Sequence, residues 1–158
     1  MDANDEQRHA ELTMRYATEQ LGLAAMLRLT HGLARPGQEA LDMVLPVLVD
    51  KGAWMKLHLL EIVGLSPNRT RALLEQTLEL LSEPAPWSEE HLRAALQTLA
   101  QGVGARGETA VELLLRIVML RGLSPLPVVP VMAILGRERS VQRLRAVLVS
   151  YVEGQLIG

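Results

Sequence analysis

Arginine is the residue type in this chain best suited to binding chemistry, and it is concentrated near the carboxyl terminus. Six arginines lie between residues 116 and 145, where Glu138 is the only acidic residue, which gives a local balance of +5. The formal net charge of the whole chain is -2. Guanidinium groups pair with phosphate in a bidentate geometry. This uneven distribution therefore permits an RNA-facing edge on an otherwise acidic protein.

The sequence offers little support for a disulfide framework, a metal site or a catalytic site. The chain has no cysteine, which excludes a disulfide framework, a thiolate zinc site and a cysteine nucleophile. Among the four histidines, only His58 shares a helical face with a carboxylate, Glu61, and two ligands do not make a zinc site. Neither a GxSxG nor a GxxxxGK[ST] sequence occurs. We therefore expect no metal, no cofactor and no catalysis by this chain alone.

One glycine-rich segment, 102–107, matches the pattern GxGxxG. A dinucleotide site needs a strand before this pattern and a helix after it, so that the pyrophosphate meets the helix N-terminus. A helical pattern precedes the segment here. We interpret it as a loop between two helices.

The elements that position these residues are predicted to be helices. Phe is absent and aromatic residues make up 3% of the chain, so Leu, Ala, Val and Met must fill the core. Apolar residues recur with the helical period, and no useful strand-like alternation appears. The predicted helices cover residues 11–29, 36–51, 54–63, 67–82, 88–101, 108–119, a short segment ending at 135, and 137–151. The predicted fold class is all-α, with two small helical halves.

The domain organisation follows from the breaks between helices. We expect an N-terminal extension over 1–28 with a frayed start over 1–11, a first half over 29–83, a proline-containing linker over 84–87 and a second half over 88–158. Ser66 and Ser88 are predicted N-caps, and Trp87 is predicted to pack on Leu92. The acidic N-terminus does not resemble a signal peptide, and the apolar run 126–135 is too short for the roughly 20 residues that span a bilayer. A soluble, cytoplasmic protein is expected.

Several short runs in the second half of the chain carry a resemblance to a known family. They are Leu115-Arg116, Val131-Met132-Ala133, the run Leu135-Gly136-Arg137-Glu138-Arg139, and Arg143-Leu144. These residues resemble the C-terminal part of the anticodon-binding domain of bacterial glutamyl-tRNA synthetases. The resemblance continues more weakly upstream, through Val44-Leu45-Pro46 and the linker, while residues 1–28 have no counterpart.

The resemblance implies an all-α domain whose partner is tRNA, with tRNA-Glu as the first choice. The catalytic signatures of the family, a His-Ile-Gly-His type sequence and a Lys-Met-Ser-Lys-Ser type loop, are absent, so aminoacylation is not expected. The residues that it suggests for RNA binding are Arg116, Arg121, Ser124, Leu126, Val128, Arg139 and Arg143.

Two alternatives remain open for the principal residues. Arg116 falls where the family places an arginine near the anticodon bases, but it could equally pair with Glu112 four positions earlier. Arg139 and Arg143 are predicted to lie opposite the apolar stripe of the last helix, either contacting phosphates or facing solvent.

The loop before that helix departs from the family. The usual Thr/Ser-Pro-x-Leu sequence is replaced by residues 125–128, of which Leu126 and Val128 could still pack on a base. The sequence thus predicts a non-catalytic tRNA-binding module. The alternatives are a repurposed scaffold that binds a protein partner and has lost RNA recognition, or one domain of a longer synthetase.

Overall fold

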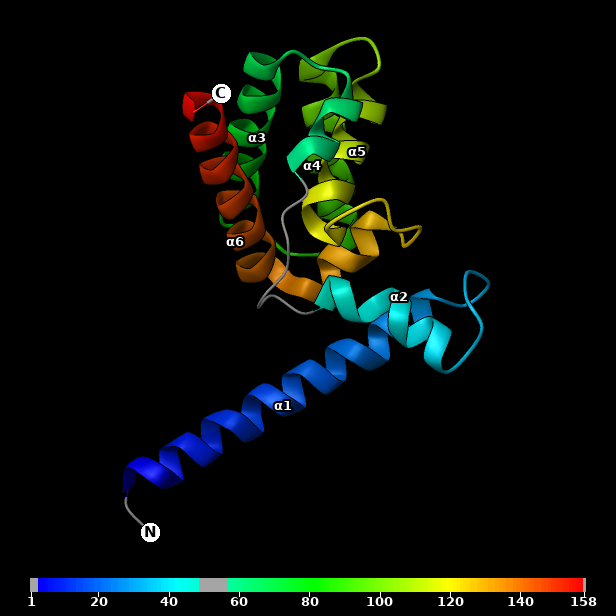
Figure 1. Ribbon diagram of the computed structural model, residues 1–158, viewed down its shortest axis with the longest axis vertical. Helices are drawn as coiled ribbons and strands as arrows, with labels where there is room; N and C mark the ends of the chain where they lie inside the picture. Colours follow the sequence, from blue (N-terminus) through cyan, green and yellow to red (C-terminus); the bar gives the residue numbers. More distant parts are fainter. Residues whose placement is uncertain (1–2, 49–56, 158) are drawn as a thin grey trace.

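The fold is helical in every described part of the chain. The computed structural model describes residues 3–48 and 57–157, and no strand occurs among them. In chain order the elements are α1 (Ala3–Leu29), α2 (Gln38–Leu48), the 3-10 helix η1 (Leu57–Val63), α3 (Pro67–Ser82), α4 (Glu89–Val103), α5 (Gly107–Leu120) and α6 (Val128–Ile157) (Figure 1). The all-α prediction is confirmed.

The two predicted serine caps are confirmed at the starts of α3 and α4. The hydroxyl of Ser66 accepts a hydrogen bond from the backbone N–H of Arg69 at 3.3 Å. Ser88 accepts one from the N–H of His91, also at 3.3 Å. Each bond satisfies one of the N–H groups that a helix leaves without a partner in its first turn. Short polar side chains therefore fix where both helices begin.

The start of the first helix and the type of the third helix differ from the predictions. The start of the chain was expected to fray up to residue 11, but α1 begins at Ala3. Asp5 and Glu6 lie in its first turn, where negative charge stabilises the positive end of the helix dipole. The helix expected over 54–63 appears as the 3-10 helix η1 from Leu57, and residues 54–56 lie outside the described residues.

Helix α5 lies at the centre of the molecule. Leu114, Leu115 and Met119 in this helix are completely buried. The helix packs against α2, η1, α4 and α6, so it contacts elements from both predicted halves (Figure 1). One hydrophobic cluster extends from Met26 in α1 to Val147 in α6. The two halves therefore share a single core.

Helix α6 is divided by a glycine. Gly136 has φ 82° and ψ 168°, which are not helical values, so it separates the segment 128–135 from the segment 137–157. A positive φ is readily adopted by glycine because glycine has no Cβ. The two predicted helices, one ending at Leu135 and one starting at Arg137, are confirmed by this kink, but the second extends to Ile157 and not only to residue 151. The second segment then runs beside α3 (Figure 1).

The glycine-rich segment 102–107 connects two helices, as predicted: its first two residues end α4, residues 104–106 form the loop, and Gly107 begins α5. The N–H of Gly104 donates to the carbonyl of Ala100 at 3.2 Å, and the N–H of Gly107 donates to the carbonyl of Gly104 at 2.9 Å. A Cβ at Gly107 would lie 2.0 Å from the Ala100 oxygen. Close packing of two helix ends accounts for this glycine, and no strand precedes the segment among the described residues.

Candidate nucleic-acid interface

Arg116 fixes the loop between α5 and α6 through its guanidinium group. Its Nε donates to Oε1 of Glu112 at 2.9 Å, and its Nη2 donates to the same oxygen. Its Nη1 donates to the backbone carbonyl of Leu126 at 2.7 Å and to that of Ser124. Of the two alternatives for Arg116, the structure shows the pairing with Glu112, and the side chain is 19% exposed. Most of the donors that could read a base edge are engaged within the protein.

The hydroxyl of Ser124 also serves the loop itself. It accepts a hydrogen bond from the N–H of Leu126 at 3.3 Å. This is the local turn that a serine side chain commonly stabilises. Ser124 and Arg116 together hold the backbone of residues 124–126 in one conformation.

Leu126 and Val128 belong to the hydrophobic core. Their relative exposures are 0% and 5%. The hypothesis that these side chains pack on a base is not supported, because neither presents a surface to solvent. Leu123, two residues before Pro125, is by contrast 56% exposed.

Arg121 lies at the C-cap of α5 in a left-handed conformation, with φ 59° and ψ 30°. Glycine commonly occupies this conformation after a helix because a Cβ is unfavourable there. The side chain of Arg121 is half-buried. This residue therefore takes part in ending the helix, in addition to any contact it makes with RNA.

The prediction that Arg139 and Arg143 share a solvent-facing surface is wrong for Arg143. Arg143 is 6% exposed, and its Nη1 donates to the backbone carbonyl of Met119 at 2.5 Å. Met119 lies in the last turn of α5, where the backbone carbonyl groups have no N–H donor within the helix. The buried stripe of α6 thus includes Arg143 beside Leu144, because the guanidinium group finds an acceptor inside the core.

Arg139 also has an internal partner. Its Nη2 donates to the backbone carbonyl of Leu48, at the end of α2, and the side chain is half-buried. The arginine thus connects α6 to an element 91 positions earlier in the chain. If Arg139 bound a phosphate, it would have to do so while keeping its hydrogen bond to Leu48, or give that bond up.

Trp87 and Arg137 form a contact that the sequence did not predict. The indole Nε1 of Trp87 donates to the backbone carbonyl of Met132 at 2.8 Å. The guanidinium carbon of Arg137 lies 5.4 Å from the centroid of the indole ring, and its Nη2 donates to the carbonyl of Ala85. A cation over an aromatic face is favourable at this distance. Trp87 was expected to pack on Leu92 at the start of α4. Its hydrogen bond to Met132 also connects the linker to α6.

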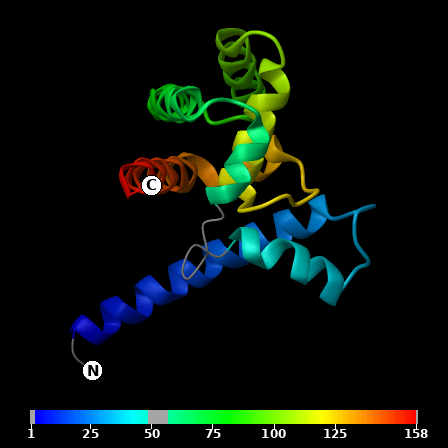
Figure 2. The ribbon, with the colours of Figure 1, turned by 45° about the horizontal axis from the view of Figure 1, so that its top comes forward.

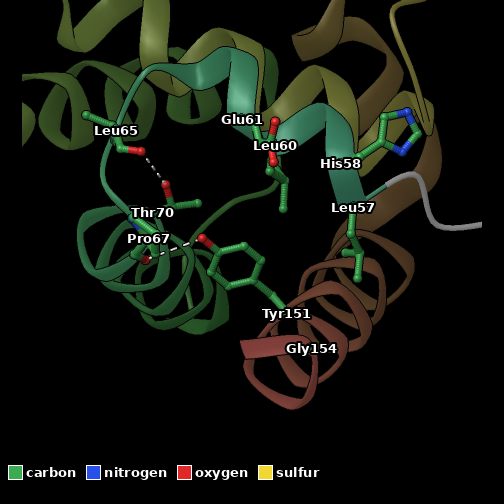
Figure 3. A pocket seen from close by; sticks show the side chains of 9 residues that line it. All are labelled: Leu57, His58, Leu60, Glu61, Leu65, Pro67, Thr70, Tyr151 and Gly154. Carbon is green, nitrogen blue, oxygen red and sulfur yellow. Dashed lines mark hydrogen bonds between the residues drawn. The ribbon is translucent and has the colours of Figure 1, made fainter. Parts of the chain in front are cut away.

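A pocket of about 420 Å³ opens between η1, the start of α3 and the end of α6 (Figure 3). Figure 3 shows the Tyr151 ring reaching from α6 toward α3, where its hydroxyl donates to the carbonyl of Pro67 at 3.4 Å. His58 and Glu61 both line this pocket. Within residues 3–48 and 57–157 no group of three or more His, Cys, Asp or Glu side chains could hold a metal ion.

Replacing Arg116 with alanine is expected to release the loop and to lower the free energy of unfolding by about 1–3 kcal/mol, because two backbone carbonyls and Glu112 lose a charged donor. Hydrogen exchange at the Leu126 amide should accelerate. Arg93, which pairs with Glu89 at 3.3 Å on an exposed part of α4, provides the control. Arg93→Ala should cost less than about 1 kcal/mol. Equal losses of stability from the two substitutions would contradict the conclusion that Arg116 holds the loop between α5 and α6.

Comparisons with known proteins come to bear on this arrangement. No helix in the described ranges is long and apolar enough to cross a membrane. No curated protein and no solved structure matches the chain. The family model described as the anticodon binding domain matches residues 37–148, which include α2, η1, α3, α4, α5 and most of α6. This chain belongs to the anticodon-binding domain family.

Proposed function

We propose that the protein is a non-catalytic, cytoplasmic tRNA-binding module related to the anticodon-binding domain of glutamyl-tRNA synthetase, with tRNA-Glu as its first-choice partner. The observation that carries this proposal is the family match over residues 37–148. It covers α5 and the elements that pack against it, and therefore most of the buried core. Binding requires no chemistry beyond hydrogen bonds and ion pairs with RNA.

The internal contacts of the arginines limit how such a module recognises RNA. Arg116 and Arg143 donate to backbone carbonyls, and Leu126 is completely buried. Few groups of the loop are left to read base edges, whereas any accessible cation can contact a phosphate. The proposed binding is therefore dominated by phosphate contacts and discriminates poorly between anticodons.

Electrophoretic mobility of labelled tRNA-Glu with the pure protein at two salt concentrations tests the proposal. We expect binding at low salt that weakens steeply as salt rises, because cations bound to phosphates release counterions. A tRNA with a different anticodon should bind with similar affinity. Absence of binding at low salt would contradict the proposal, provided that circular dichroism shows a folded, helical protein.

The same internal contacts favour a second candidate function, a helical scaffold that binds a protein partner and has lost RNA recognition. A scaffold needs only the buried core and the hydrogen bonds that Arg116, Arg139 and Arg143 donate to backbone carbonyls. It needs no accessible guanidinium group at those positions. The low-salt experiment separates the two candidates, since a scaffold should leave the mobility of tRNA unchanged. For either candidate we expect neither pyrophosphate exchange into ATP nor charging of tRNA with glutamate.

A further inference from the structure

Two segments lie on the same side of the molecule, at the right in both views, and together they form what we name the tip surface (Figures 1 and 2). They are residues 28–37, which comprise the end of α1 and the loop to α2, and residues 121–127, between α5 and α6. Helix α2 contacts both α1 and α5, so the two loops flank a common element. The first loop lies outside the residues that the resemblance to synthetases suggested for RNA binding.

The composition of the tip surface differs from that of the rest of the chain. It contains Arg28, Arg35, Arg121 and His31, and no acidic residue. Arg28, His31 and Arg35 are exposed. The nearest acidic residue in sequence is the exposed Glu39 in the first turn of α2, followed by Asp42, which accepts a hydrogen bond from Gln38 at 2.7 Å. A chain whose formal net charge is -2 thus presents accessible positive charge at this end.

Two large apolar side chains are exposed in the same place. Leu33 is 44% exposed and Leu123 is 56% exposed, one in each loop. Exposed leucines beside arginines match the chemistry of single-stranded RNA, whose phosphates pair with cations and whose unstacked bases pack on apolar or planar groups.

The loop that carries Leu33 is held in place by its own hydrogen bonds. The N–H groups of Leu33 and Ala34 donate to the carbonyl of Thr30 at 2.8 and 3.0 Å. Thr30 is 4% exposed, and its hydroxyl donates to the carbonyl of Leu27 at 2.6 Å. A loop that is already ordered loses little conformational entropy when it binds.

We infer that the tip surface is the RNA-contact surface of the proposed module, with Arg28 and Arg35 contacting phosphates and Leu33 and Leu123 packing on bases of a single-stranded segment. This inference rests on the proposed tRNA binding. It assigns the phosphate contacts to arginines that face solvent, instead of Arg139 and Arg143, whose guanidinium groups donate to backbone carbonyls inside the protein.

The test uses a fluorescently labelled tRNA-Glu transcript and the intact chain in a salt titration. The variant Arg28→Ala/Arg35→Ala should weaken binding at least tenfold at low salt and should reduce the slope of log affinity against log salt by about 1.4, since each lost single-strand phosphate contact removes about 0.7. The variant Arg93→Ala/Arg145→Ala removes the same charge from exposed sites on α4 and α6, and it should change the affinity less than threefold.

A second variant tests the apolar contacts. Leu33→Ser/Leu123→Ser should weaken binding about tenfold while leaving the salt slope unchanged, because no charge is lost. Equal losses from the two arginine double variants, with the intact protein still binding tRNA, would overturn the tip surface and leave the proposed function standing. No binding by the intact, folded protein at low salt would overturn the proposed function itself.

Discussion

Replacing Arg143 with methionine is expected to lower the free energy of unfolding by about 1–3 kcal/mol. The guanidinium group is buried and donates to the carbonyl of Met119 in the last turn of α5. Methionine fills much of the volume of the arginine stem but donates no hydrogen bond, so it leaves this buried carbonyl without its donor. Chemical denaturation followed by circular dichroism measures the change.

Arg145 provides the matched control for this substitution. It lies two residues further along α6 and is exposed. Arg145→Met should change the free energy of unfolding by less than about 0.5 kcal/mol, as is usual for exposed positions without special contacts. If both variants were equally stable, Arg143 would not be part of the core.

A second large effect is expected at Gly107, where alanine should lower the free energy of unfolding by about 3 kcal/mol. The new Cβ would meet the backbone oxygen of Ala100 at 2.0 Å, and a backbone atom cannot move aside as the end of a flexible side chain can. The ends of α4 and α5 would have to separate. Thermal or chemical denaturation reports the loss of stability.

Gly102 is the control for Gly107 because it belongs to the same glycine-rich segment. It lies inside α4, and a Cβ there would meet no atom within 4 Å. Gly102→Ala should raise the free energy of unfolding by about 0.5–1 kcal/mol, since alanine loses less backbone entropy than glycine in a helix. A similar loss in both variants would show that the segment does not form the close helix–helix contact.

Local signals allowed most of the fold to be predicted from the sequence. The serines at 66 and 88 mark helix starts through bonds to N–H groups three positions later. Gly136 marks the division of α6 because few other residues adopt a positive φ there. These features depend on a few adjacent residues. The exceptions were the start of α1, the 3-10 form of η1 and the end of α6, where no strong cap or breaker marks the boundary.

The destinations of the arginine side chains could not be predicted in the same way. Arg137 donates to a carbonyl 52 positions away, Arg139 to one 91 positions away and Arg143 to one 24 positions away. Helical periodicity shows which residues share a face but not what that face meets. A rule that assigns charged residues to the surface therefore placed Arg143 on the wrong side of α6. A buried guanidinium needs hydrogen-bond acceptors, and in this chain a carbonyl at the end of another helix supplies one for Arg143.

The position of α6 affects how the chain folds as it leaves the ribosome. This helix contacts α1, α3, α4 and α5, and its arginines reach the ends of α2 and α5. Until residues 128–157 have emerged, the apolar side chains of α5 lack part of their cover, and chaperones that bind apolar segments can recognise them. Helices such as α3 and α4 can form earlier, but the core closes only when the last long-range contacts are made. A stall of translation before residue 128 should therefore leave an intermediate with exposed apolar side chains, which is prone to aggregate.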